Sequence, residues 1–338
     1  MSDWKIYQGT GPDNGRAPIQ WPEPPPWRVF DGLDKKRGLT YRPTEVEKEA
    51  VNAALHLRRP LLVTGSPGRG KSSLAYAVAE ELGLSPVLRW SINSRSTLAE
   101  ALYQYDAIAR LRDANLEDKG KVPLGTSNDI GRYLRLGPLG TALLPSPKPR
   151  VLLIDEIDKS DVDLPNDLLH VFEEGRFEIT ELVRLAALPD AGPPTMAGPS
   201  SNKVVRVLPY DKTRDEDRIS IIEGRVSATT FPFVLLTSNN ERDLPPAFFR
   251  RCLRLNIPDP DQARLEKIVA AHLGMADPNK PDGRTELIER YLKKQNNGQL
   301  VATDQLLNAL FLVTRGNIPA GSERERMVDA LLKELDRT

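Results

Sequence analysis

The sequence has a single cysteine, Cys252, among 338 residues, which excludes an internal disulfide framework and favours a reducing compartment. It also lacks an excess of either charge, because 47 basic residues balance 47 acidic ones. Binding of nucleic acid or of an anionic membrane through overall charge is therefore not indicated, while a local basic groove stays compatible with the composition. No apolar run approaches the roughly 18 residues of a membrane span, and no basic-then-apolar signal opens the chain, so we expect a soluble, cytoplasmic protein without membrane contact.

Histidine is also scarce. His56, His170 and His272 are isolated and share no spacing with cysteines or carboxylates, which argues against a metal centre or a catalytic triad built on them. No serine lies in a nucleophile-elbow pattern. We expect these histidines to lie in the core or on helix surfaces, and Cys252 to be a small core residue.

Proline clusters mark the expected domain boundaries. Residues 1–40 contain QWPEPPPWRVF and little periodicity, which predicts a stiff N-terminal arm. Pro258 and Pro260 form the clearest later break. We therefore predict an α/β domain over 41–258 and a small helical domain over 259–338, where only helical periodicity follows.

The stretch LLVTGSPGRGKS, residues 61–72, predicts a phosphate-binding loop. Gly65 and Gly70 bracket four positions before Lys71 and Ser72, an apolar strand precedes them, and a helix follows. Backbone N–H groups of such a loop cradle phosphate oxygens; Lys71 reaches the β- and γ-phosphates and the Ser72 hydroxyl binds Mg²⁺. The predicted nucleotide contacts of the loop are Gly65, Ser66, Pro67, Gly68, Arg69, Gly70, Lys71, Ser72 and Ser73.

A second stretch, VLLIDE at residues 151–156, predicts a buried strand that ends in two carboxylates. Alone it fits a strand that runs into a solvated acidic turn. Together with the loop upstream, it predicts the metal and base half of a nucleotide hydrolase site. Asp155 then holds Mg²⁺ through water, and Glu156 polarises the water that attacks the γ-phosphate.

The order of elements predicts a parallel sheet with helices on both faces. Further apolar strands are expected over 87–93 and 231–240, with one amphipathic helix over 96–115 between the first of these and a Gly-interrupted insertion. A β-hairpin is expected to turn near Glu223 and Gly224. Residues 185–203 are poor in core-forming residues and are either a regulatory segment or a tolerated insertion.

Two polar positions follow buried segments. Asn239, at the carboxyl end of the strand over 231–240, is either a loop amide without a ligand or a sensor of the γ-phosphate and its water. Arg250 and Arg251 follow a Pro-Pro turn. They are either a solvated helix end or a source of an arginine that reaches a neighbouring subunit's triphosphate and stabilises transition-state charge there.

The segments GSPGRGKS, VLLIDEID, TSNN and FFRRC, followed by a helical region, resemble AAA+ ATPases, with spacing closest to the MoxR branch. The resemblance covers roughly residues 41–335 and places a helix-2 insertion at about 128–144, a pre-sensor hairpin at about 204–229 and a helical lid after 259. It implies that Asn239 is the first sensor and Arg251 the arginine finger, with Arg250 as the fallback. It further implies that Tyr41 and Arg42 contact the adenine.

One position departs from that pattern. The lid arginine that serves as second sensor is expected where this chain has Ala302, Thr303, Asp304 and Gln305. Either that contact is missing or another residue replaces it.

The resemblance implies Mg·ATP hydrolysis at the subunit interfaces of a homo-oligomeric, hexameric ring that remodels a protein partner, one with a von Willebrand factor A-type domain. Two alternatives stay open. One is a ring motor on nucleic acid, which Arg132 and Arg135 of the insertion favour and the net charge of zero disfavours. The other is a nucleotide-gated scaffold with little turnover, which the missing lid arginine favours.

Overall fold

The computed structural model describes residues 5–7, 9, 19, 21–120, 126–188, 203–275, 283–315, 318 and 321–333. The chain forms two compact units. Unit 1 comprises Met1–Thr44, Gly65–Ala77 and Ile257–Thr338, and unit 2 comprises Glu45–Thr64 and Val78–Asn256. The predicted phosphate loop thus groups with the C-terminal helices and the N-terminal arm, a division that the composition breaks do not mark.

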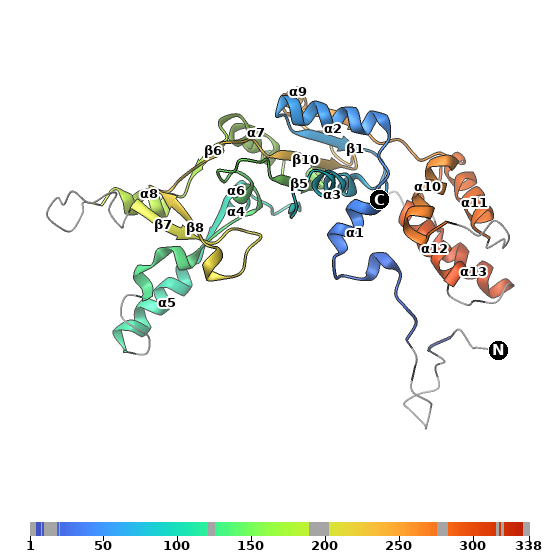
Figure 1. Ribbon diagram of the computed structural model, residues 1–338, viewed down its shortest axis with the longest axis horizontal. Coiled ribbons are helices and arrows are strands. Elements are labelled where there is room, and N and C mark those ends of the chain that lie inside the picture. Colours follow the sequence, from blue (N-terminus) through green and yellow to red (C-terminus); the bar gives the residue numbers. More distant parts are fainter. Residues whose placement is uncertain are drawn as a thin grey trace. The chain divides into compact units, whose positions relative to one another are not determined.

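Unit 2 is built on the expected parallel sheet, with strand order β11-β1-β10-β5-β2 (Figure 1). The strands are β1 (Leu61–Thr64), β2 (Leu88–Ser91), β5 (Val151–Asp155), β10 (Phe233–Ser238) and β11 (Leu253–Asn256). Every residue of β5 and β10 is buried, which explains why these strands read as continuous apolar runs rather than alternating ones. The prediction of a parallel sheet flanked by helices is confirmed.

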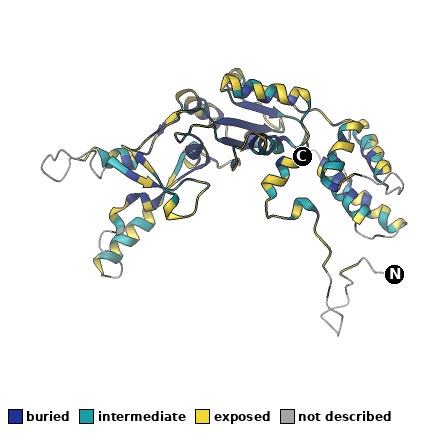
Figure 2. Ribbon diagram, in the orientation of Figure 1, coloured by how far each residue is buried: buried dark blue, intermediate teal, exposed yellow. Residues whose placement is uncertain are grey.

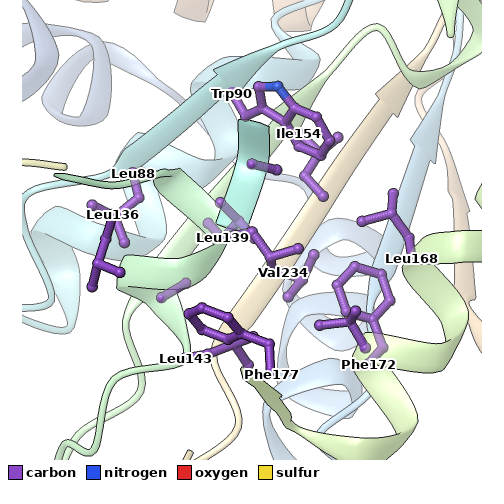
Figure 3. Packing of buried hydrophobic residues seen from close by; sticks show 14 of the residues in the cluster. Leu88, Trp90, Leu136, Leu139, Leu143, Ile154, Leu168, Phe172, Phe177 and Val234 are labelled. Atoms are coloured by element: carbon purple, nitrogen blue, oxygen red, sulfur yellow. The ribbon is translucent and has the colours of Figure 1, made fainter. Parts of the chain in front are cut away.

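Helices cover the sheet and close its core. They include α2 (Glu45–Leu57), α3 (Lys71–Glu81), α6 (Pro138–Ala142), α7 (Leu164–Glu174) and α9 (Pro246–Arg251). Figure 3 shows Trp90, Ile154 and Val234 of three neighbouring strands packed with Leu139 of α6 and Phe172 of α7. In Figure 2 the central strands β1, β5 and β10 are buried along nearly their whole length, while the helices carry exposed outer faces. This packing fixes the sheet's carboxyl edge, where the predicted catalytic residues begin.

The prediction of one helix over 96–115 is wrong. The chain forms α4 (Leu98–Leu102), then β3 (Tyr103–Tyr105), then α5 (Ala107–Asp118). Two local causes break the helix: the tyrosines of β3 pair antiparallel with β4 (Leu134–Leu136), and the Asp106 carboxylate accepts from the Ala109 N–H as a new N-cap. The insertion therefore begins before the Gly-interrupted stretch from which it was predicted.

A second sheet, of order β6-β9-β8-β7, contains the expected hairpin. Its strands are β6 (Arg176–Glu178), β7 (Val204–Val207), β8 (Ile219–Ile222) and β9 (Arg225–Ser227), with α8 (Thr180–Ala186) beside them (Figure 1). Glu223 and Gly224, both at positive φ, form the two-residue turn, as predicted. Residues 189–202 of the core-poor stretch lie outside the described residues.

The C-terminal helices of unit 1 have a core of their own. They are α10 (Gln262–Leu273), α11 (Arg284–Asn296), α12 (Thr303–Arg315) and α13 (Ser322–Leu331), and they match the predicted helical segments. The N-terminal arm contributes η1 (Pro26–Arg28) and α1 (Leu33–Thr40). Trp27 of η1 packs edge-on against His272 and Phe311 and donates from Nε1 to Asn308 Oδ1 at 3.0 Å. Part of the arm is thus fixed to these helices.

Among the described residues, no helix combines the length and the hydropathy that crossing a bilayer requires.

Candidate functional site

The phosphate loop connects β1 to α3, which begins at Lys71. Gly65, Gly68 and Gly70 all have positive φ, at 143°, 73° and 76°, so the loop uses backbone conformations that favour glycine. A Cβ on Gly65 would lie 2.5 Å from the Ile257 carbonyl oxygen. The Lys71 ammonium donates to the carbonyl oxygens of Gly65 and Ser66 at 2.7 and 3.0 Å. The loop thus folds back over its own lysine, with N–H groups at the start of an 11-residue helix.

A cavity of about 400 Å³ opens beside the loop within unit 1. Its size falls in the range of small-molecule sites, about 300–1,000 Å³. Of the predicted contacts, those that line the cavity are Tyr41, Arg42, Gly68, Arg69, Gly70 and Ser73. Lys71, Ser72, Gly65, Ser66 and Pro67 do not line it, although they belong to the same loop.

The cavity also has walls that the sequence did not reveal. These include Trp27, Arg28, Arg37, Ile257, Arg264, Ile268, His272 and Leu307. Arg264, Ile268 and His272 lie four residues apart on α10, so they share one helix face. That spacing was visible in the sequence, but nothing in it indicated that the face turns toward the loop. The result is a cavity with apolar walls and several cationic side chains, which suits a flat, apolar base attached to an anion.

His272 lies on the wall of the cavity, where burial favours its neutral form. Burial lowers the pKa of its imidazole, and its Nδ1 lies 2.9 Å from the Ile268 carbonyl oxygen. Because a carbonyl oxygen only accepts, Nδ1 carries the proton. His272 is therefore a packed, half-buried wall of the cavity, which agrees with the expectation of a core or helix-surface histidine.

The position of the missing lid arginine is occupied by close packing. A Cβ on Gly68 would lie 2.5 Å from Ala302 Cβ, so the loop and the start of α12 touch. Thr303 and Asp304 line the cavity, and neither is a cation. The cations on its wall come instead from other elements, among them Arg42 between α1 and α2 and Arg264 from α10.

In unit 2, Asp155 ends β5 at the carboxyl edge of the sheet. Its side chain accepts from Thr237 Oγ1 at 2.8 Å and from the Arg89 guanidinium at 2.7 Å. The residue is 7% exposed, so this carboxylate has its charge balanced by Arg89 from the neighbouring strand β2. Carboxylate and hydroxyl oxygens are the ligands that Mg²⁺ prefers, and Mg²⁺ commonly needs just one or two protein carboxylates. The Asp155 carboxylate in unit 2 and the Ser72 hydroxyl in unit 1 are each ligands of that kind. Among the described residues, no group of three or more His, Cys, Asp or Glu side chains is placed to hold a metal ion.

Glu156 follows Asp155 in a left-handed conformation, with φ of 64°. Its N–H donates to Thr237 Oγ1 at 2.8 Å, which fixes its backbone to β10. Its carboxylate accepts from the Lys159 ammonium at 2.9 Å, and this hydrogen bond raises the pKa of Lys159. The predicted base is thus half of an ion pair within its own turn.

Asn239 lies on the same edge of the sheet, directly after β10, which pairs with β5. The Asp158 carboxylate accepts from the N–H groups of Asn239 and Glu241 at 2.9 and 3.0 Å. The Asn239 amide donates to Glu241 Oε1 at 3.2 Å. The sheet therefore brings the predicted base and the predicted sensor to adjacent strand ends.

Arg250 and Arg251 end α9, and both are exposed. Arg251 forms an ion pair with Glu173 of α7, while the Arg59 side chain donates to the backbone carbonyls of both arginines. Cys252 behind them is buried, and burial raises the pKa of its thiol to about 12, so it is a core residue as predicted. The helix end is held on the surface of unit 2 with its guanidinium groups outward.

The parallel sheet, the loop at the end of β1 and the C-terminal helices define the class: an α/β protein with the fold of P-loop NTPases. The family model of the AAA domain, dynein-related subfamily, matches residues 60–252, more than half of the chain. The chain therefore belongs to the AAA domain family.

Other comparisons add little beyond this. Among solved structures, NtrX from Brucella abortus in complex with ADP is similar, with a TM-score of 0.37 and 14% sequence identity. That similarity covers 86% of this chain and 52% of NtrX, so the chain spans about half the length of that protein. No curated protein matches the chain.

Proposed function

We propose that the chain is an ATP hydrolase that binds Mg·ATP through the phosphate loop and the cavity beside it. One observation carries the proposal: the cavity joins the glycines of the loop to Tyr41 and Arg42, the residues expected at the adenine. An anion cradle and an apolar recess thus adjoin within unit 1. A nucleotide, with its flat base and charged phosphates, matches both ends.

The chemistry proposed is in-line attack of water on the γ-phosphate. Lys71 holds the β- and γ-phosphates, Ser72 and Asp155 hold Mg²⁺, Glu156 accepts the proton of the water, and Asn239 orients that water. Mg²⁺, when bound, neutralises charge on the phosphate oxygens. Arg251, or Arg250 in its place, acts on the nucleotide of a neighbouring copy, since both arginines are exposed at the end of α9.

Assembly and partner follow from the resemblance to the MoxR branch. We propose a hexameric, homo-oligomeric ring in the cytoplasm that uses hydrolysis to remodel a protein partner, one with a von Willebrand factor A-type domain. The insertion between α4 and α6 and the hairpin β8–β9 support assignment to this branch, because both occur at the positions expected from the resemblance.

A nucleotide-gated scaffold with little turnover is the second candidate, and one observation favours it. The charged groups proposed for hydrolysis are each paired within the chain: Asp155 with Arg89, Glu156 with Lys159, and Arg251 with Glu173. Hydrolysis requires Glu156 and Arg251 to leave these partners, while nucleotide binding by the loop does not.

Steady-state ATP hydrolysis at several protein concentrations, with particle mass followed with and without ATP, separates the candidates. Activity per subunit that rises as a hexamer-sized particle forms supports the ring hydrolase. Tight ATP binding without hydrolysis supports the scaffold. Absence of ATP binding overturns both.

The variant Glu156→Gln sharpens this experiment. We expect it to bind ATP normally and to lose turnover by roughly 10²–10⁴-fold, the usual contribution of a general base. Glu289→Gln, the same change at an exposed position of α11, is the matched control. Near-normal hydrolysis by Glu156→Gln removes this residue from the role of base.

A further inference from the structure

Arg69, the residue of the loop before Gly70, has a buried side chain. The side chain is 2% exposed, although arginine is rarely buried without a partner. It forms an ion pair with Asp259 at 2.7 Å and donates to the Tyr291 hydroxyl at 2.6 Å. With the Gln295 amide oxygen turned toward it, both terminal nitrogens of Arg69 also find an acceptor there, at 2.9 and 2.6 Å.

These contacts join the loop to the helices that follow the sheet. Tyr291 and Gln295 belong to α11, and Asp259 precedes α10. Tyr291 is fully buried, and its hydroxyl donates to the Val301 carbonyl at 3.0 Å, directly before α12. Together with the contact between Gly68 and Ala302, they fix the loop to α11 and α12 at two points.

Such a network contributes little net stability. Burial of the Arg69 side chain has a desolvation cost that often offsets the attraction of Asp259, whose side chain is 53% exposed, whereas removing that partner leaves an uncompensated buried charge. Its planar fork makes arginine suited to holding several acceptors in one geometry. The network therefore specifies a position of α11 relative to the loop more than it stabilises the fold.

The loop has a reason to change when phosphates bind. Lys71 now donates to the carbonyl oxygens of Gly65 and Ser66. Phosphate oxygens compete for the same ammonium, because an anionic acceptor attracts it more strongly than a neutral carbonyl does. A change in the loop backbone moves Arg69, two residues before Lys71, and with it the acceptors on α11.

We propose that Arg69 is a positioning residue that couples nucleotide in the phosphate loop to the placement of α11 and α12. In this connection a side chain of the loop reaches the helices. The lid arginine that residues 302–305 lack belongs to the helices and would reach the other way. The inference rests on the proposed nucleotide binding. Such coupling requires that the contacts of Arg69 differ between the nucleotide-free and the nucleotide-bound protein.

Amide hydrogen exchange with and without ADP, on the full chain, tests the proposal. In the wild type we expect ADP to slow exchange in the loop, 65–73, and in α11, 284–296. In Arg69→Met, ADP still protects the loop but no longer protects α11. Arg326→Met, the same change at an exposed arginine of α13, retains both effects and is the matched control.

Two further variants keep the proposal testable if Arg69→Met does not fold. Tyr291→Phe removes one hydroxyl from the network and is expected to weaken the protection of α11 without affecting the loop. Arg69→Lys keeps the charge but not the fork, and is expected to restore the protection in part. In hydrolysis, we expect Arg69→Met to raise KM for ATP by about fivefold or more, at the lower end of typical coupling, with little change in kcat.

The outcomes separate the inference from the function on which it depends. Protection of α11 that persists in Arg69→Met and in Tyr291→Phe overturns the coupling and leaves nucleotide binding intact. A wild type in which ADP protects neither segment overturns the proposed nucleotide binding, and the coupling with it.

Discussion

The phosphate loop and the carboxyl edge of the sheet differ in what holds their charged groups. In the loop, the Lys71 ammonium donates to the backbone carbonyl oxygens of Gly65 and Ser66. At the sheet edge, Asp155 and Glu156 are each paired with a cation of the same chain. An anionic phosphate oxygen attracts the ammonium more strongly than these neutral carbonyls do, whereas the two carboxylates at the sheet edge already face a cation.

This difference suggests that nucleotide binding and hydrolysis are separable in this chain. The loop presents the N–H groups at the start of α3 and a lysine held by backbone carbonyls. The sheet edge and the end of α9 are arranged with ion pairs that hydrolysis has to open. The predictions below alter one region at a time.

Lys71→Ala is expected to have the largest effect, because it removes the cation of the binding region. We expect ATP affinity to fall by at least about a hundredfold, since each charge-assisted hydrogen bond contributes about 1.5–3 kcal/mol, and hydrolysis to fall to background. Titration calorimetry measures the affinity. Lys267→Ala, an exposed lysine of α10, is the control; unchanged affinity in Lys71→Ala rejects the phosphate-loop assignment.

Arg251→Ala affects the other side of the comparison. ATP affinity is expected to stay normal, while kcat falls by about 10³-fold, the lower range for an arginine finger. Mixing Arg251→Ala with Glu156→Gln subunits is expected to restore part of the activity, because each variant supplies what the other lacks. No recovery on mixing, in particles confirmed to contain both chains, argues against a finger that acts in trans.

Lys159→Met opens the ion pair of the predicted base without touching the loop. Both side chains are over 40% exposed, and such pairs are worth about 1 kcal/mol or less, so we expect kcat to rise by at most about fivefold. Affinity for ATP is expected to stay constant. A fall in kcat instead shows that Lys159 positions Glu156 rather than restraining it.

The smallest effect is expected from a change of pH, which alters the free energy of unfolding through His272 in the cavity beside the loop. Burial lowers the pKa of His272 below its ordinary value of 6.5, so the unfolded chain takes up this proton more readily than the folded chain. Its contribution to stability is present above pH 6.5 and is lost as pH falls through the lowered folded pKa. Thermal midpoints at pH 7.5 and 5.5 measure this.

Two variants assign that pH dependence. His272→Gln is expected to flatten it, whereas His170→Gln, at an exposed histidine of α7, leaves it unchanged. An identical slope in wild type and His272→Gln assigns the pH dependence to other groups.

The strands and the loop were predictable because their signals are local. Four apolar residues before Asp155 identify a strand buried on both faces, and the spacing of Gly65, Gly70 and Lys71 encodes one backbone conformation. The helix over 96–115 was predicted wrongly for the opposite reason. Its periodicity is helical on both sides of Tyr103–Tyr105, and the pairing partner that makes this segment a strand lies some thirty residues later.

The sequence by itself determined the parallel sheet, the phosphate loop, the C-terminal helices and the family, since these depend on spacing and hydrophobic pattern within short windows. Only the tertiary structure decided what surrounds the loop: Trp27 against α12, the α10 face in the cavity, and Arg69 buried between Asp259 and Tyr291. Contacts between residues 69 and 291 leave no trace in local periodicity. Burial and charge pairing between residues so far apart in the sequence arise only when the chain packs. The tertiary structure therefore decides the roles of these residues.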